Sequence, residues 1–159
     1  MTPDALRPAQ RFMYEFGTFV AFWSNFELMV EVGIWLHSGT TAKENCKSIN
    51  VLKAGRKKER LKKLLDEIGN VDAGNALVEV FDVADRNGWI HGHILNPNGD
   101  FSRLTRLRVE VKGPSFYVTN TVVRTDSFDP FYEAYASFEQ KSGITKAQCD
   151  EYIRLVQTA

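Results

Sequence analysis

The sequence has few cysteines, no net charge and little proline in its first half. Its 159 residues include two cysteines, Cys46 and Cys149, which lie far apart and predict buried thiols rather than a disulfide-stabilised fold. The formal net charge is zero, so no global field would draw the protein to nucleic acid or to an anionic membrane. Any contact with nucleic acid must therefore come from a local patch. After Pro8, which can open a helix, no proline occurs until Pro97.

Targeting, membrane and cofactor signals are also lacking. The N-terminus has no basic region, apolar run and cleavage site of the kind that a signal peptide needs. The stretch 16–36 is largely apolar but includes Glu27 and Glu31, which makes it too polar for a bilayer span and predicts a packed core helix. A soluble, cytoplasmic protein is expected. No phosphate-binding loop, dinucleotide fingerprint or Cys/His zinc spacing occurs, so we expect no cofactor and no metal.

The most regular feature is one helix of roughly 28 residues that ends at Ser38-Gly39. Apolar residues at steps of three and four form a stripe along it: Phe12, Phe16, Phe19, Trp23, Phe26, Val30, Ile34 and His37. A second stripe on another face runs through Met13, Val20, Leu28, Val32 and Trp35. Two apolar faces are more than a small bundle can bury, so the second face predicts a homodimer interface.

The remaining chain predicts one domain, 1–159, of helices with a small β-hairpin. After a polar connection, a second helix is expected over 52–68, and a third helix capped by Asp72 continues through Trp89. Alternation on both sides of Gly113-Pro114 predicts a hairpin at about 104–123. Helices are expected again from Asp129-Pro130 to Gly143, and from about Thr145 to Val156.

Near the expected end of the third helix, Arg86, Asn87 and His91 place a fixed cation, an amide and a titratable ring within one and a half turns. On a regular helix Asn87 and His91 lie about 40° apart, whereas Arg86 and His91 lie about 140° apart. Such a group can hold a phosphodiester and move a proton beside it. The structural alternative is that Arg86 pairs with Glu27 or Glu31 while His91 is a core histidine.

The pattern Arg86-Asn87-x-x-x-His91-Gly92 at the end of a helix resembles the signature of the HEPN (higher eukaryotes and prokaryotes nucleotide-binding) superfamily. The segment from Ala21 to Glu27, Ala-Phe-Trp-Ser-Asn-Phe-Glu, is similar to a segment in the first long helix of many members. The resemblance covers roughly Arg11 to Gly92. It implies a mainly α fold, an antiparallel up-and-down helical bundle that dimerises, here with the hairpin inserted before the C-terminal helices.

For active members the resemblance also implies a metal-independent endoribonuclease with its site at the dimer interface. Arg86 would hold the scissile phosphate, and His91 would act as general base or acid on the ribose 2′-hydroxyl and the leaving oxygen. Asn87 would orient the phosphate or the histidine. The products would carry a 2′,3′-cyclic phosphate. His91 of one subunit could work with Arg86 of the other, which removes the 140° difficulty.

Other relatives are binding or regulatory modules, and some are toxins with an antitoxin or operon partner. Some are modified at a tyrosine two positions after the histidine, where this chain has His93. Cations on the second helix predict a track for the RNA backbone, with a solvated helix face as the alternative. The track residues are Lys53, Arg56, Lys57, Arg60 and Lys63. Two hypotheses stay open: a ribonuclease, and a non-catalytic RNA- or protein-binding module in which the cluster ties the third helix to Glu27.

Overall fold

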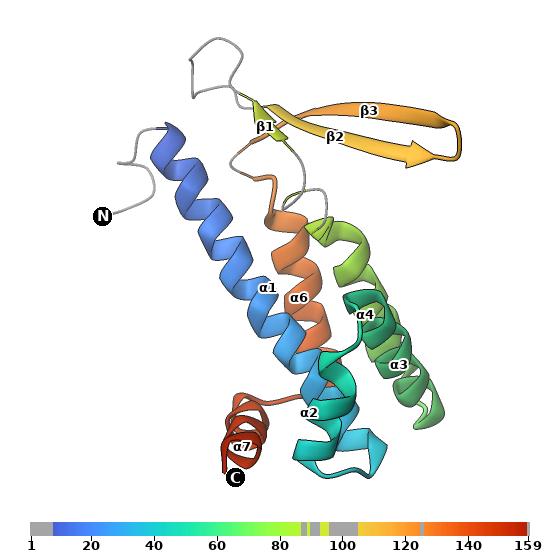
Figure 1. Cartoon of the computed structure of the whole chain (residues 1–159). Helices are drawn as coiled ribbons and strands as arrows, with labels where there is room; N and C mark the ends of the chain where they lie inside the picture. Colours follow the sequence, from blue (N-terminus) through green and yellow to red (C-terminus); the bar gives the residue numbers. More distant parts are fainter. Residues whose placement is uncertain (1–7, 87–88, 90–92, 96–104, 125, 159) are drawn as a thin grey trace. The chain divides into compact units, whose positions relative to one another are not determined.

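The computed structural model describes residues 8–86, 89, 93–95, 105–124 and 126–158. The protein is mainly α, with a small antiparallel sheet ahead of the two C-terminal helices, which confirms the predicted fold class (Figure 1). The helices are α1 (Pro8–Ser38), α2 (Ala42–Asn50), α3 (Ala54–Glu67), α4 (Val71–Ala84), α6 (Asp129–Ser142) and α7 (Lys146–Gln157). The strands are β1 (His93–Leu95), β2 (Thr105–Lys112) and β3 (Ser115–Val122).

The chain forms two compact units, and α1 contributes to both. Unit 1 contains the chain up to Val20 together with Ala84–Pro130, and unit 2 contains Ala21–Val83 and Phe131–Ala159. Unit 1 therefore holds the sheet and the start of α1, whereas unit 2 holds most of the helical bundle. The prediction of a single domain over 1–159 stays a prediction.

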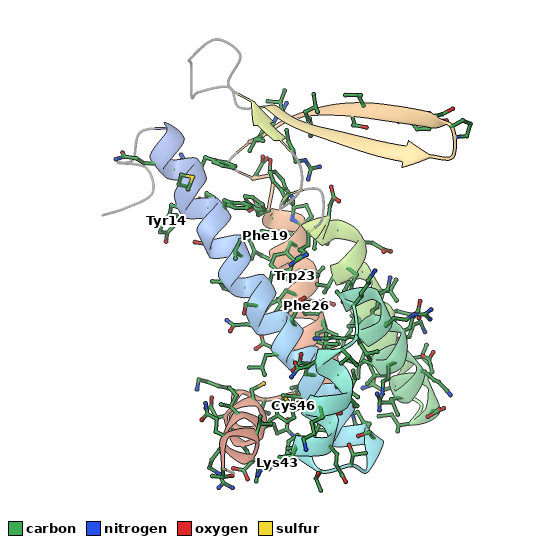
Figure 2. All side chains as sticks on the ribbon, viewed as in Figure 1. Tyr14, Phe19, Trp23, Phe26, Lys43 and Cys46 are labelled. Atoms are coloured by element: carbon green, nitrogen blue, oxygen red, sulfur yellow. The ribbon has the colours of Figure 1, made fainter. Side chains whose placement is uncertain are left out.

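The core of unit 2 is built on the first apolar stripe of α1. Trp23 and Phe26, labelled in Figure 2, are buried, as are Val30 and Ile34 further along the helix. The ring centroids of Phe26 and Phe138 lie 5.5 Å apart, and those of Trp23 and Phe131 lie 6.2 Å apart. These pairs advance together along both helices, so α1 and α6 run in the same direction. The long return of the chain through α2, α3, α4 and the sheet makes this possible.

The second stripe is divided between buried and exposed residues. Val32 is buried, and Trp35 packs on Tyr152 of α7 with ring centroids 5.4 Å apart. Met13 and Val20 are exposed. Because α7 covers the C-terminal part of the stripe, less apolar surface of α1 is left for a second subunit than the sequence predicts.

By length and composition alone, α1 is also apolar enough to cross a membrane. Core helices of soluble proteins pass the same test, and 44% of the most apolar stretch of α1 is buried inside the protein. The buried rings of Trp23 and Phe26 show α1 acting as a core helix.

The predicted polar connection after α1 contains a helix, α2. The Thr41 hydroxyl accepts from the Glu44 N–H, and the Glu44 carboxylate accepts from the Thr41 N–H, which is a complete capping box. On its buried face, the Asn45 amide donates to the Glu31 carbonyl and to the Tyr152 hydroxyl, both at 3.2 Å. One amide thus links α1, α2 and α7.

Tyr152 should make the stability of the protein sensitive to alkaline pH. Burial raises the pKa of Tyr152 from 10.0 to about 12, against the opposing effect of the Asn45 hydrogen bond. A phenol whose pKa is raised by folding contributes stability that is complete below the unfolded value and is lost as the pH rises through the folded value. The free energy of unfolding is therefore expected to fall between pH 10.0 and about 12. Urea denaturation across this range measures it.

In Tyr152→Phe this alkaline fall should be smaller, because the group responsible is gone. Tyr14→Phe removes the hydroxyl of an exposed tyrosine on α1 and is the matched control. Parallel curves for wild type and Tyr152→Phe would contradict the expectation.

The turn between α3 and α4 lies where the second predicted helix was expected to end, but the predicted cap of the next helix is wrong. Gly69 has a φ of 81°, which favours glycine after a helix end. Asn70, rather than Asp72, caps α4, because its side-chain oxygen accepts from the Ala73 N–H at 3.2 Å. Asp72 lies within the first turn, so the predicted cap is wrong by two residues.

The predicted third helix is also shorter than expected. Helix α4 ends at Ala84, and Asp85 has a φ of 39°. Positive φ is uncommon outside glycine, although Asp and Asn adopt it more readily than other residues. A helical hydrogen bond resumes from the Trp89 N–H to the Asp85 carbonyl at 3.0 Å. The prediction of one continuous helix through Trp89 is therefore wrong, because the helix axis is interrupted just before Arg86.

The sheet of unit 1 is antiparallel with strand order β1-β2-β3. Strands β2 and β3 confirm the predicted hairpin, with Lys112 opposite Ser115 across the turn Gly113-Pro114. Gly113 has a φ of 61° and proline fixes the next φ near −65°, which together give a type II′ turn. Strand β1 was not predicted and pairs with only the first three residues of β2.

The C-terminal helices confirm the predicted ones. Helix α6 begins at Asp129, and Gly143 follows its end with a φ of 66°. Thr145 caps α7 through a second capping box, completed by Gln148.

Candidate functional site

The motif predicted from sequence begins where α4 ends. Arg86 follows the left-handed residue Asp85 and is half-buried. Asn87 and His91 lie outside the described residues. The predicted angle between Arg86 and His91 is therefore not tested. His93 is the first residue of β1, and its backbone pairs with that of Leu107 on β2.

Arg106 of β2 contacts the motif segment at two points. Its Nη1 lies 2.9 Å from Asp85 Oδ2, an ion pair that rests on charge rather than on an aligned hydrogen bond. Its guanidinium also lies 4.3 Å from the centroid of the Trp89 ring, within the range of a cation–π contact. Asp85 precedes Arg86 in the chain and Trp89 lies between Asn87 and His91. The sheet is thereby attached to the motif segment on both sides of Arg86.

Trp89 is in turn held by aromatic packing inside unit 1. Its ring lies 4.5 Å from the ring of Phe128, which lies 4.8 Å from the ring of Phe19 on α1. Trp89, Phe128 and Phe19 are all buried. Such packing fixes side-chain orientation, as a site that must hold a phosphate in one geometry requires.

The role of Arg106 differs from that of a substrate-binding cation. Its side chain is 12% exposed and its charge is balanced by Asp85. It is therefore suited to positioning the motif rather than to binding a phosphate directly. The alternation of β2 predicts on which face of the strand Arg106 lies. Its ion pair with Asp85 cannot be predicted from a local pattern, because Asp85 lies 21 residues earlier in the chain.

In the structural alternative, Arg86 forms an ion pair with Glu27 or Glu31. The Glu31 carboxylate accepts from Lys57 Nζ at 2.6 Å, and the two side chains are only 17% and 14% exposed. Glu31 is thus engaged by α3. Glu27, the residue to which the binding-module hypothesis ties the cluster, is half-buried on α1.

The predicted track on α3 contains cations of two kinds. Lys57 belongs to the buried pair with Glu31, which gives it a structural role. Arg56 and Lys63 are exposed and pair along the helix with Glu59 at 3.0 Å and Glu67 at 3.7 Å. Exposed pairs of this kind are weak, so both cations stay accessible to a phosphate.

The two other track residues lie nearer to α2. Lys53 occupies the N-cap position of α3 and is exposed. Arg60 Nη1 lies 3.5 Å from the Ser48 hydroxyl, at the limit of a hydrogen bond. The structure thus leaves Lys53, Arg56 and Lys63 as the more accessible cations of the predicted track.

Elsewhere among the described residues we looked for a metal site and for a nucleophile. Within them, no group of three or more His, Cys, Asp or Glu side chains is placed to hold a metal ion. A groove of about 340 Å³ in unit 2 is lined by Met29, Tyr135 and Cys149, among others. Burial raises the pKa of the Cys149 thiol, which disfavours the thiolate that a nucleophile needs.

No protein-family model, curated protein or solved structure matches this chain.

Proposed function

We propose that this protein is a metal-independent endoribonuclease of the HEPN type, with Arg86, Asn87 and His91 as its catalytic residues. The observation that carries the proposal is the position of the motif. The chain leaves α4 through a left-handed aspartate immediately before Arg86, and Arg106 contacts the residues on either side of it. A break in helical geometry supported by tertiary contacts is typical of functional sites.

The proposed chemistry needs only groups that this motif supplies. RNA brings its own nucleophile, the ribose 2′-hydroxyl, which attacks the adjacent phosphorus while the 5′-oxygen leaves. His91 would accept the 2′-hydroxyl proton and a proton would be delivered to the 5′-oxygen, which leaves a 2′,3′-cyclic phosphate and a 5′-hydroxyl. Arg86 would neutralise the charge that develops on the phosphate, and Asn87 would orient it.

The proposal also includes the location, the oligomeric state and the partners of the protein. The protein would act as a cytoplasmic homodimer, with RNA as substrate and an antitoxin or operon partner as regulator. Lys53, Arg56 and Lys63 would guide the RNA backbone.

A second candidate is a non-catalytic RNA- or protein-binding module. The buried pair of Lys57 with Glu31 favours it, because that pair removes one cation from the predicted track. A formal net charge of zero points the same way. In this case Arg86 would serve packing and would not touch a scissile phosphate.

Cleavage of a mixed RNA pool in excess EDTA separates the two candidates. Wild type is expected to cleave and to leave cyclic-phosphate ends, whereas His91→Ala is expected to fold normally and not to cleave. End-group analysis of the products and circular dichroism of both proteins are the measurements. If neither folded protein cleaves, the binding module is favoured. Equal cleavage by both would remove His91 from the mechanism.

A further inference from the structure

The β2–β3 hairpin has a long strand at its edge. The strand order β1-β2-β3 places β3 at one edge of the sheet among the described residues. At the other edge, the three residues of β1 pair with Thr105, Arg106 and Leu107, so among the described residues only β2 and β3 form the outer part of the hairpin, from Arg108 onward (Figure 1). The eight residues of β3 thus form a continuous edge that could accept a further strand.

Described side chains on both faces of the outer hairpin are exposed. Successive residues of a strand point to opposite faces, and Tyr117 and Val118 are 54% and 51% exposed. A hairpin packed on a core through one face would bury one of these two. Isolated two-stranded hairpins are marginally stable in water, and three or more strands are needed for independent stability. The hairpin is therefore a structure that a further strand would stabilise.

The composition of β3 favours pairing rather than preventing it. Its sequence, Ser-Phe-Tyr-Val-Thr-Asn-Thr-Val, has no charged residue and no proline, and it is rich in β-branched and aromatic residues. Proteins commonly protect exposed edges with charges or proline. Strand β2 carries alternating charges, at Arg106, Arg108, Glu110 and Lys112, and so has such protection along its length. The unprotected strand is the one at the edge.

We propose that β3 pairs with β3 of a second copy of this chain, antiparallel about a two-fold axis. In a two-fold interface each strand meets its own sequence, so a strand without charges brings no like charges together in any register. Pairing would join two hairpins into one continuous sheet. A nucleic-acid strand is a poorer fit, because β3 offers no Lys or Arg to the phosphates. The inference does not rest on the proposed ribonuclease activity.

The hairpin register identifies the residues that would make the new pairing. With a two-residue turn, Lys112 and Ser115 form the first hydrogen-bonded pair, and such pairs alternate along an antiparallel ladder. The backbone groups of Ser115, Tyr117, Thr119 and Thr121 are then directed to β2. Those of Phe116, Val118, Asn120 and Val122 are directed outward, toward a new strand.

Val118→Pro is accordingly the sharpest variant. It removes an outward N–H and should leave the β2–β3 ladder intact, because proline is tolerated where the N–H faces away from the sheet. We expect wild type to dimerise and Val118→Pro to raise the dimer dissociation constant roughly tenfold or more. Sedimentation equilibrium measures the constant, and circular dichroism reports whether each variant is folded.

Charge substitutions provide the controls. Val118→Lys should also weaken the dimer, since it places two like charges at the shared edge. Val51→Lys makes the same substitution at a valine that is 81% exposed beyond α2, and it should leave the dimer unchanged. Val20→Lys tests the exposed part of α1 as the alternative interface.

Disulfide trapping tests the geometry without depending on a proline variant that folds. In a Cys46→Ser background, which keeps the buried Cys149, one new cysteine is placed in turn from Ser115 to Val122. Opposed residues in antiparallel strands have Cα atoms about 4.5–5.5 Å apart, within the range that a disulfide spans. Cross-linking should peak at the residue nearest the two-fold axis and fall on either side of it.

Three results would overturn the proposal. The first is a wild-type protein that stays monomeric up to its solubility limit, which would assign the β3 edge to another occupant or to none. The second is a dimer that survives Val118→Pro and Val118→Lys but is lost in Val20→Lys, which would place the interface on α1. The third is cross-linking without a maximum along β3.

Discussion

Phe26→Ala is expected to lower the free energy of unfolding by about 3–5 kcal/mol, the cost of truncating a fully buried phenylalanine. Phe26 has no exposed surface and lies at the centre of the aromatic core of unit 2. Its ring centroid is 5.3 Å from that of Phe81, 5.4 Å from that of Trp23 and 5.5 Å from that of Phe138. Truncation would leave a cavity among three rings from α1, α4 and α6, none of which can close it without losing its other contacts.

Phe22→Ala is the matched control, one turn earlier on the same helix. Phe22 is 39% exposed and makes edge contacts with Tyr132 and Tyr135. Its loss should cost about 1 kcal/mol, since solvent and neighbouring side chains can fill the space. Urea denaturation followed by circular dichroism gives both values. Equal losses in the two variants would show that the α1–α4–α6 contact is not the centre of the core.

A loss of this size would also affect any function of the protein. Domains of this size are stable by about 5–15 kcal/mol, so Phe26→Ala removes a large part of the margin. The variant therefore serves as a stability control for substitutions in the motif. A motif variant that loses activity while keeping the wild-type unfolding curve has lost chemistry rather than structure.

The sequence predicts the helical core because its signal is local and periodic. Phe19, Trp23, Phe26, Val30 and Ile34 are all buried, as their steps of three and four require. The hairpin is equally readable from its alternation and from Gly113-Pro114. Helix α2 could also have been predicted, since Thr41-x-x-Glu44 has the spacing of a capping box. Its surface is largely polar, however, and it buries only Ala42, Asn45 and Ile49.

The features that escape prediction depend on partners distant in sequence. The left-handed conformation of Asp85 cannot be predicted from the sequence, because its neighbours favour a helix. Its ion-pair partner Arg106 lies on a strand 21 residues later. Strand β1 has three residues, too few to show alternation. Lys57 resembles its neighbours on α3, and only the packing of α1 against α3 brings Glu31 to it.

In the candidate site too, the sequence predicts local features but not the contacts with residues distant in the chain. Its residue types and order were found by resemblance to the HEPN motif, and the described structure adds Arg106 and Trp89 as neighbours. Zero net charge over the whole chain does not exclude a basic local surface. From Lys53 to Glu67 the sequence has seven Lys or Arg and three Asp or Glu, so α3 together with its N-cap residue carries a formal charge of 7 − 3 = +4.

Arg86→Ala and His91→Ala are each expected to abolish most RNA cleavage. Loss of a group that stabilises developing charge costs about 10²–10³ in rate. Loss of a general acid–base group costs about 10²–10⁴. Cleavage by Arg86→Lys should stay well below wild type, because an ammonium cannot make the two parallel contacts of a guanidinium. Rates are measured on one RNA substrate in EDTA, with the unfolding curve of each variant as its stability control.

Mixing the two inactive variants tests whether one site draws on both subunits. If Arg86 of one chain works with His91 of the other, a mixed dimer of Arg86→Ala with His91→Ala has one complete site and one that lacks both groups. With random exchange half of the dimers are mixed, so about a quarter of the wild-type activity should return. Each variant exchanged with itself should stay inactive. If the mixture stays inactive although the subunits have exchanged, each site is built within a single chain. Arg86 must then reach His91 locally, which the helix break at Asp85 would have to permit.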